Sequence, residues 1–514
     1  MPCAATPVPT PDVASIFAAY RAATARLGVH PVRTLEVRGL ITGPDVVGIY
    51  HAWIAGDDER IDEDYGVQST TLYRIGDRAF LRDENGDVRE LRHEGLREVR
   101  DRLWIERGGF LDDPSSARVL GIGTSDGRPI VVVRVIAPDG DEQTLGFDRA
   151  SGLLDERSYR TPDGVVREIY RDRRLVGGAL IAYRRIEERP LPPSPLERVV
   201  LSAVADAPIT PGIFAVPSQP IVATQRPVRI PLQWRNAHLF APIALRGRQY
   251  WFLVDTGAQS IVVDRRVAAQ ALLVPQTSVE ITGLHRVSGG SIAALDAIVV
   301  GGVRVPIGVV SIVDLGAATS GAFPIAGILG RPFFSAADVR IEPARAAMVV
   351  APPGTLRREG TCLPLDIDAG LPLVEASVQG VRGRFLLDTG NGDELLLDRR
   401  FVDAHPGLVD VLEGAPLPNA GIGGSVRAVR VTIGELDLGG YRLYHRATDV
   451  LLDSAGAFQA NGVSGNIGLG TLKNFTTTFD LEDEIVCVRP GGLFDDGRFR
   501  TGVERTLIPP PRRR

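Results

Sequence analysis

Two aspartates occur in the same local context, each at the end of an apolar run and each followed by Thr-Gly. Asp255 follows the run 250–254, and Asp388 follows the run 385–387. Each run predicts a buried strand, and a carboxylate at the end of a buried strand is costly unless it has a partner. One Asp-Thr-Gly is also ordinary turn chemistry, but two in one context indicate a pair. Two carboxylates that meet share a proton, and such a pair can activate water by general acid–base catalysis.

The sequence that follows each aspartate repeats in the same order. A glycine-containing segment comes first, then an apolar stretch ending in two glycines, then an apolar-apolar-Gly element and finally a strand-like run. The matching segments are 288–291 and 423–425, 299–302 and 436–440, 327–330 and 465–470, and 339–342 and 478–481. The preserved order predicts a duplicated domain in which each half brings one aspartate to a shared axis.

These elements resemble the aspartic peptidases of the retropepsin and pepsin clan over roughly residues 222 to 490. In that family each lobe contributes one Asp-Thr-Gly and one apolar-apolar-Gly element, which here are Ile328-Leu329-Gly330 and Asn466-Ile467-Gly468. The resemblance implies two homologous β-barrel-like lobes, at 222–354 and 355–490. Because both aspartates lie in one chain, a monomer would carry the complete site.

The resemblance also assigns roles to the residues around the two aspartates. Asp255 and Asp388 would be the catalytic pair, and no metal or cofactor is expected. The threonine hydroxyl groups would donate hydrogen bonds to the backbone of the opposite lobe. The glycines would let the backbone approach the carboxylates closely and would permit backbone angles that a side chain forbids. The supporting residues are Thr256, Gly257, Ala258, Thr389 and Gly390. The chain departs from the family at Asn391-Gly392, where alanine or serine is usual.

Two glycine-containing segments are candidate flaps that would close over a substrate and exclude water. They contain Gly289 and Gly290 in the first repeat and Gly423 and Gly424 in the second. Either segment taken alone is equally consistent with an ordinary hairpin turn.

Two functions are compatible with this pattern. The first is an aspartic endopeptidase in which water activated between Asp255 and Asp388 hydrolyses a polypeptide. Because the protons belong to the pair, neither residue is assigned as acid or base. The second is a non-catalytic sensor or binding protein that keeps the fold and captures a peptide or lipopeptide, which the variation at Asn391 favours. A Ser-His-Asp triad is not supported, because no histidine lies at a credible position for Ser260.

Composition restricts the remaining possibilities. The chain has 514 residues, 44% hydrophobic and 24% charged, which is ordinary for a globular protein of about three domains. Its 57 glycines and 37 prolines favour a mainly β fold with many turns. A net charge of −5 predicts no nucleic-acid-binding face. No apolar run approaches the ~20 residues of a transmembrane helix, so no transmembrane segment is predicted.

The three cysteines bear on localisation. Cys362 and Cys487 lie in the first and last strand-like runs of the second repeat, where they could form a disulfide or remain two separate buried thiols. The N-terminus lacks the pattern of a signal peptide, and Cys3 is interpreted as an incidental surface residue rather than a lipidation site. The expected location is the periplasm, the cell envelope or the exterior, with the cytoplasm as the alternative.

Residues 1–187 predict a separate β-rich domain. Amphipathic helices are predicted over 12–27 and about 96–107, among alternating strands separated by Asp-Gly turns. The strands are predicted at 35–40, 48–54, 71–75, 79–82, 130–135 and 143–147. This order resembles the lipoprotein-carrier (LolA-type) fold, which implies a curved antiparallel sheet over helices and an apolar cavity for a lipid or lipopeptide. A packed core with a structural or docking role is the alternative.

Two further segments are predicted to lie outside the domains. Residues 188–221 are rich in proline, which can neither continue a helix nor donate to a sheet, and predict a stiff linker. Residues 491–514 end in three arginines and predict a disordered basic tail.

Overall fold

The computed structural model describes residues 11–43, 46–161, 164–189, 195–282, 287–316, 324–367, 370–412, 414–421, 424–452 and 462–498. Its fold is mainly β, which confirms the predicted class. The chain divides into two compact units, which are described separately. The first comprises Met1–Asp83 and Val88–Ser218, and the second comprises Glu84–Asp87 and Gln219–Arg514.

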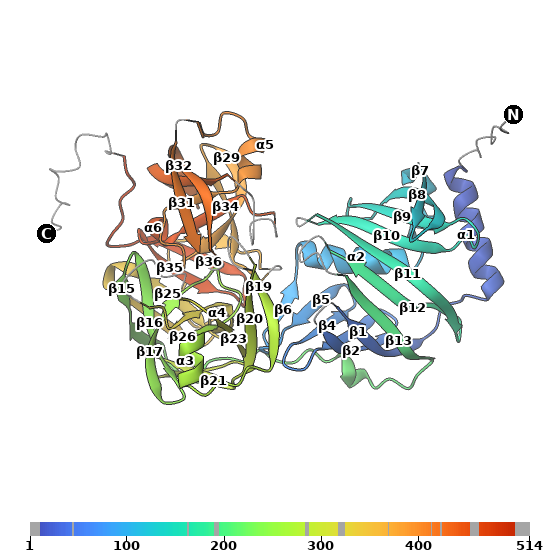
Figure 1. Cartoon of the computed structure of the whole chain (residues 1–514), viewed down its shortest axis with the longest axis horizontal. Coiled ribbons are helices and arrows are strands. Elements are labelled where there is room, and N and C mark those ends of the chain that lie inside the picture. The colour runs from blue at the N-terminus through green and yellow to red at the C-terminus, as the bar shows by residue number, and fades with distance from the viewer. Residues whose placement is uncertain are drawn as a thin grey trace. The chain divides into compact units, whose positions relative to one another are not determined.

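The first unit contains a 13-stranded antiparallel sheet with the order β6-β5-β4-β3-β2-β1-β13-β12-β11-β10-β9-β8-β7 (Figure 1). Its strands are β1 Thr34–Thr42, β2 Val47–Ala55, β3 Asp58–Asp64, β4 Ser69–Ile75, β5 Arg78–Arg82, β6 Val88–Leu91, β7 Arg118–Ser125, β8 Arg128–Ile136, β9 Glu142–Asp148, β10 Leu154–Thr161, β11 Gly164–Val176, β12 Ala179–Glu188 and β13 Leu196–Ala205. The six predicted strands correspond to β1, β2, β4, β5, β8 and β9.

Two helices pack on this sheet. Helix α1 spans Val13–Leu27, begins after the capping carboxylate of Asp12 and ends at Gly28, whose φ of 76° is left-handed. Its Phe17 ring packs against Phe110 in an apolar cluster that includes strands β8 and β9. Helix α2 spans Glu94–Glu106, two residues earlier than predicted at its start, and buries Val99 against β5 and β6. Both helices therefore cover apolar parts of the same sheet.

The predicted linker over 188–221 is wrong at residues 196–205. Residues Leu196–Ala205 form β13, which pairs with β1 and β12 and so lies inside the sheet. A 3-10 helix at Pro211–Phe214 follows, with the Phe214 side chain buried. The apolar run in β13 gains ladder hydrogen bonds on both edges, which a linker would not. The neighbouring prolines obscured this strand in the sequence.

The second unit contains three sheets (Figure 1), and two of them carry one aspartate loop each, after β17 and at the end of β29. The first has the order β19-β20-β23-β18-β24-β17-β16-β21-β22, with β15 also paired to β16. Its strands are β15 Gln233–Arg235, β16 His238–Leu245, β17 Arg248–Val254, β18 Val262–Asp264, β19 Thr277–Thr282, β20 Val287–Ala294, β21 Ala297–Val300, β22 Val303–Pro306, β23 Val309–Val313 and β24 Gly327–Leu329. Helices α3 (Arg265–Gln270) and α4 (Arg331–Ser335) follow β18 and β24.

The other loop belongs to a seven-stranded sheet with the order β28-β29-β34-β30-β33-β32-β31. Strand β28 also pairs with β32, which curls this sheet on itself. Its strands are β28 Leu373–Val378, β29 Val381–Asp388, β30 Leu395–Leu397, β31 Ala415–Gly421, β32 Gly424–Leu438, β33 Tyr441–Leu451 and β34 Gly465–Gly468. Helices α5 (Arg399–Ala404) and α6 (Leu469–Leu472) follow β30 and β34.

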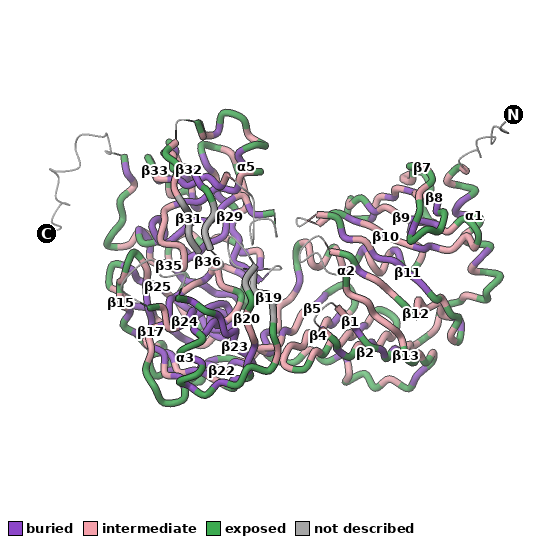
Figure 2. The backbone as a smooth tube through the Cα atoms, viewed as in Figure 1, coloured by how far each residue is buried: buried purple, intermediate pink, exposed green. Residues whose placement is uncertain are grey.

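A six-stranded sheet connects the two halves of this unit. Its order is β14-β26-β25-β35-β36-β27, so three strands come from each half. They are β14 Val228–Pro231, β25 Asp338–Glu342, β26 Ala347–Ala351, β27 Thr361–Pro364, β35 Phe475–Asp480 and β36 Ile485–Pro490. The halves meet where β25 pairs with β35, and the side chains of Val339 and Phe479 at this junction are fully buried. Buried residues, drawn purple in Figure 2, are frequent in the interior of this unit. One apolar core therefore continues across both halves.

The predicted disordered tail over 491–514 is wrong for residues 491–498. Phe494 packs its ring against Phe475 at 5.6 Å, and the carbonyl of Asp496 accepts a hydrogen bond from the backbone N–H of Tyr444. Residues 491–498 are thus part of the folded unit, and 499–514 lie outside the described residues. Among the helices described, none is long and apolar enough to cross a membrane.

Candidate functional site

The two Asp-Thr-Gly loops lie in equivalent strand arrangements. Strand β17 leads into Asp255 and runs parallel to β24, with Val254 opposite Leu329. Strand β29 ends at Asp388 and runs parallel to β34, with Asp388 opposite Gly468. After each loop the chain returns antiparallel to the same partner, through β18 on β24 and through β30 on β34. Each aspartate is therefore held between strands rather than on a free turn.

Reciprocal hydrogen bonds between the two threonines join the loops. The Thr256 hydroxyl donates to the carbonyl of Leu387 at 2.6 Å, and the Thr389 hydroxyl donates to that of Val254 at 2.9 Å. Each hydroxyl also accepts a bond from the backbone N–H of the other threonine, at 3.1 and 3.0 Å. Both side chains are buried, so these four bonds fix one loop against the other without competition from water.

The two carboxyl groups meet at this junction, where their side chains share a hydrogen bond. Each glycine faces the opposite aspartate: a Cβ on Gly257 would lie 2.6 Å from Cγ of Asp388, and one on Gly390 would lie 2.2 Å from Cγ of Asp255. Neither glycine has a left-handed φ, so that part of the expectation was wrong. Glycine is required here by the space that the opposite carboxyl group occupies.

The surroundings of Asp255 favour its protonated form. Burial, followed by the negative charge of Asp388 and their shared hydrogen bond, raises the pKa of Asp255 well above its ordinary value. The backbone N–H of Gly257, which donates to its Oδ1 at 2.9 Å, opposes this effect but does not cancel it. A carboxyl group that keeps its proton to higher pH than usual can act as a general acid.

The stability of the second unit should depend on this proton. An unfolded aspartate ionises near pH ~3.9, whereas folded Asp255 keeps its proton to higher pH. The resulting contribution to the unfolding free energy is fully present below about pH 4 and is lost as the pH rises through the folded pKa, by about 1.4 kcal/mol per unit of difference. Urea denaturation should show the wild type losing stability over this range relative to Asp255→Asn, which cannot titrate. Parallel curves for the two proteins would contradict the raised pKa.

Asp388 has a different set of partners. Its Oδ1 accepts hydrogen bonds from the backbone N–H groups of Gly390 at 2.8 Å and Asn391 at 3.1 Å, and its Oδ2 accepts one from Nδ2 of Asn466 at 2.6 Å. Asn466 lies in the second apolar-apolar-Gly element, at the position that the apolar Ile328 occupies in the first. The signal was an amide in place of an apolar residue, and its role was missed.

The remaining predicted residues are placed as follows. Ala258 follows the first loop, and its carbonyl accepts a hydrogen bond from the N–H of Arg331 at 2.8 Å. Gly289 and Gly290 lie within β20, which pairs with β19 as a hairpin. Gly424 begins β32, which pairs with β31, and Gly423 lies outside the described residues. Both segments are thus hairpins, and their function as flaps stays a prediction.

Other polar residues near the loops have structural partners. The Ser260 hydroxyl lies 3.1 Å from that of Ser311. Asp393 forms an ion pair with Arg430 at 3.1 Å. Among the described residues, no group of histidine, cysteine and acidic side chains could hold a metal ion.

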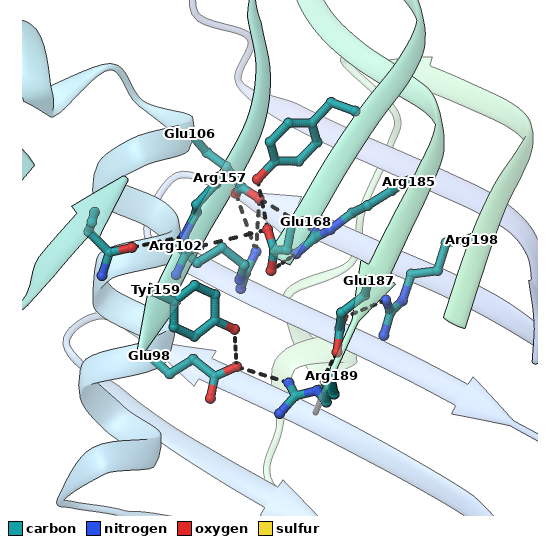
Figure 3. Close-up of polar contacts among 12 residues, drawn as sticks. Glu98, Arg102, Glu106, Arg157, Tyr159, Glu168, Arg185, Glu187, Arg189 and Arg198 are labelled. Carbon is teal, nitrogen blue, oxygen red and sulfur yellow. Dashed lines mark hydrogen bonds and ion pairs between the residues drawn. The ribbon is translucent and has the colours of Figure 1, made fainter. Parts of the chain in front are cut away.

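The first unit contains a cluster of charged side chains between α2 and strands β10 to β13, buried at its centre and partly exposed at its edges (Figure 3). Its members, here called the charged cluster, include Glu98, Arg102, Glu106, Arg157, Tyr159, Glu168, Arg185, Glu187, Arg189 and Arg198. At its centre, Glu168 accepts hydrogen bonds from the Tyr170 hydroxyl at 2.7 Å and from Arg185 at 2.8 Å. Burial opposes ionisation, but the charges of Arg185 and Arg157 lower the pKa of Glu168 to about 2.

The charged cluster differs from the apolar cavity that the lipoprotein-carrier resemblance implies. Its groups pair with one another: the Tyr159 hydroxyl donates to Glu98 at 2.8 Å, and Arg198 contacts Glu187 at 2.9 Å. Buried charges are tolerated when they are paired, whereas their contact with hydrocarbon is costly. This part of the interior therefore favours the alternative expectation of a packed core.

The structure decides between the two alternatives for the cysteines. Cys362 and Cys487 lie opposite each other on β27 and β36 and form a disulfide. Cys3 lies outside the described residues.

Comparison with known proteins supports part of the sequence interpretation. Residues 241–333 match the aspartyl protease family. No curated protein matches the chain. Among solved structures, an aspartic proteinase from Irpex lacteus is 11% identical, with a TM-score of 0.34, covering 52% of this chain and 98% of its own. A DUF1329 family protein from Desulfovibrio piger is also 11% identical, with a TM-score of 0.30, covering 40% of this chain and 98% of its own.

A LolA superfamily protein from Nitrosomonas europaea is 13% identical, with a TM-score of 0.27, and covers 40% of this chain and 98% of its own. TM-scores in this range do not establish a shared fold. The family match at 241–333, which includes Asp255 and Gly330, is the finding that bears on the site.

Proposed function

We propose that the second unit is a two-lobed aspartic endopeptidase that hydrolyses polypeptides with a water molecule activated between Asp255 and Asp388. The observation that carries this proposal is that reciprocal threonine bonds join the loops of two separate halves, so that the carboxyl group of each aspartate lies against the glycine of the opposite loop. The match of residues 241–333 to the aspartyl protease family supports it. Asn391, which motivated the non-catalytic alternative, donates its backbone N–H to Asp388 and leaves the carboxyl group in place.

The reaction requires one ionised and one protonated carboxyl group. The water oxygen attacks the scissile carbonyl carbon while a water proton passes to the ionised carboxylate and the protonated carboxyl group gives its proton to the carbonyl oxygen. The resulting gem-diol then collapses. One of its hydroxyl groups returns a proton to the carboxyl group that had protonated the carbonyl oxygen, and the carboxyl group that had accepted the water proton gives it to the departing nitrogen. The C–N bond breaks, one water is consumed, and both carboxyl groups regain their starting states.

The proposal is tested by incubating the full chain with an unfolded protein substrate between pH 3 and 7 and identifying new peptide termini by mass spectrometry. We expect internal cleavage that is maximal at acidic to neutral pH. Intact substrate at every pH, together with retained peptide binding, would overturn the proposal in favour of the non-catalytic alternative.

The disulfide supports a location in an oxidising compartment, such as the periplasm, the cell envelope or the exterior. In protein isolated from its native cells, Cys362 and Cys487 should resist alkylation until a reductant is added. Because the bond joins the first and last strands of the second half, its reduction should lower the unfolding free energy by about 2–4 kcal/mol. Alkylation of both residues without reductant would contradict this location.

The first unit is not assigned a lipid-binding function. The charged cluster itself offers no apolar lining to an acyl chain, because its members are charged or polar side chains.

A further inference from the structure

Two carboxamide side chains flank Asp388, and the sequence provides none at the equivalent positions around Asp255. Asn466 on β34 lies opposite Leu386, which is two residues before Asp388. The equivalent residue of the first half is Ile328 on β24, which lies opposite Leu253, two residues before Asp255. In the same way, Asn391 follows the second Asp-Thr-Gly where Ala258 follows the first. The two halves of the dyad therefore have the same backbone but different side-chain donors.

The orientation of both carboxamides is fixed by a backbone group. The N–H of Asp393 can only donate, and it donates to Oδ1 of Asn391 at 3.0 Å. Nδ2 of Asn391 is therefore directed to Oδ1 of Asn466, at 3.2 Å. This leaves Nδ2 of Asn466 to donate to Oδ2 of Asp388 at 2.6 Å. We call these three linked hydrogen bonds the carboxamide relay.

We propose that the carboxamide relay assigns the roles within the dyad, so that Asp388 is the ionised base and Asp255 carries the proton. Asn466 and Asn391 are positioning residues in this reading, which rests on the proposed peptidase function. The relay supplies one N–H donor to Oδ2 of Asp388, and two backbone N–H groups donate to its Oδ1, which makes three donors in total. N–H donors stabilise the ionised form of a carboxyl group. A reversed Asn466 amide would instead face Asp388 with an acceptor and require a proton there.

The surroundings of the relay make this assignment effective. Asn466 is fully buried, so water cannot replace its N–H. Asp255 and Asp388 interact directly, and two close carboxylates cannot both ionise cheaply. The raised pKa of Asp255 agrees with a proton on that residue. In the reaction, the water proton then passes to Asp388, and Asp255 protonates the carbonyl oxygen.

Two substitutions of Asn466 test the relay through the pH profile of kcat/KM. Asn466→Leu keeps a similar shape but removes the donor. We expect the acidic limb of the profile to move about one pH unit higher, with activity near that limb reduced about tenfold. Asn466→Asp is isosteric and can donate only while protonated. We expect this variant to be active at low pH and, as the pH rises, to lose activity at a lower pH than the wild type does.

Asn474→Asp is the matched control. Asn474 is another buried asparagine of the same half, and it bonds to the carbonyl of Thr471 at 2.8 Å rather than to Asp388. It should alter stability but leave the shape of the pH profile unchanged. If both Asn466 variants keep the wild-type profile, the relay proposal is wrong while the peptidase proposal stands.

A second measurement separates this proposal from the peptidase function itself. Carbon-13 spectra of protein labelled at the aspartate carboxyl carbons, assigned with Asp255→Asn and Asp388→Asn, report ionisation without any substrate. We expect Asp388 to ionise at lower pH than Asp255, and Asn466→Leu to reduce this separation. If these spectra are obtained but the protein cleaves no peptide, the peptidase proposal is wrong and the relay proposal stands. If Asp255 ionises at lower pH than Asp388, the relay proposal is wrong.

Discussion

Asp388→Asn should reduce peptide hydrolysis by about a thousandfold or more, because the variant lacks the carboxylate that accepts the water proton. Asp255→Asn should cause a loss of similar size, since the scissile carbonyl oxygen then lacks its proton donor. Asparagine is isosteric with aspartate and can keep hydrogen bonds to neighbouring groups, so the fold should persist in both variants. The measurement is kcat/KM on a peptide that the wild type cleaves, with circular dichroism to check folding.

Asp403→Asn provides the control for this pair. Asp403 is an exposed residue of α5 that pairs with Arg399, four residues earlier, and such pairs contribute only a few tenths of a kcal/mol. Its loss should leave hydrolysis within about twofold of the wild type. If Asp255→Asn or Asp388→Asn retained wild-type hydrolysis, a shared dyad could not be the source of the activity.

The strands that position the dyad could be predicted because their sequence pattern agrees with their burial. The apolar runs before Asp255 and Asp388 are largely buried strands, β17 and β29, and the apolar-Gly elements at Gly330 and Gly468 end at the loops as expected. Period and composition carry most of the information in such segments. The duplicated context then indicated that the two carboxylates form a pair.

Strands of the first unit were missed where charged residues lie inside the fold. Strand β3 has the sequence Asp-Glu-Arg-Ile-Asp-Glu-Asp, which is typical of an exposed turn, yet Glu59 within it is buried against Arg102. Strands β11 and β12 similarly contribute Glu168 and Arg185 to the charged cluster. Sequence patterns assign charge to the surface because isolated charges are rarely buried. Pairing between distant strands becomes visible only once the sheet is assembled.

The asymmetry of the dyad was also beyond the sequence pattern. The sequence pattern assigned no role to Asn466, although its amide donates a hydrogen bond to Asp388. That contact depends on the orientation of Asn391, which depends in turn on the backbone N–H of Asp393. A motif gives residue types at fixed spacing, whereas the direction of a donor depends on a chain of side-chain orientations. Departures from a motif can therefore be substitutions with a function of their own.

Gly390→Ala should abolish measurable hydrolysis and destabilise the second unit by about 1–3 kcal/mol or more. Its Cβ would lie 2.2 Å from Cγ and 2.3 Å from Oδ2 of Asp255, far inside van der Waals contact. The loop cannot withdraw easily, because the Thr256 and Thr389 hydrogen bonds hold it against the opposite half. The added methyl group must therefore separate the carboxyl groups. Gly257→Ala should act in the same way from the other side, through Asp388.

Gly212→Ala is the matched control, because a Cβ at this position meets no atom within 4 Å and its φ is not left-handed. It should leave both kcat/KM and the urea midpoint close to the wild type. A glycine that is needed for a left-handed φ is strained by any side chain, even in open space. Gly390 is different, because the three atoms nearest to its Cβ position all belong to the carboxyl group of Asp255. Gly390→Ala combined with Asp255→Gly should therefore recover stability without recovering activity. Continued instability of the double variant would show that the strain arises in the loop itself.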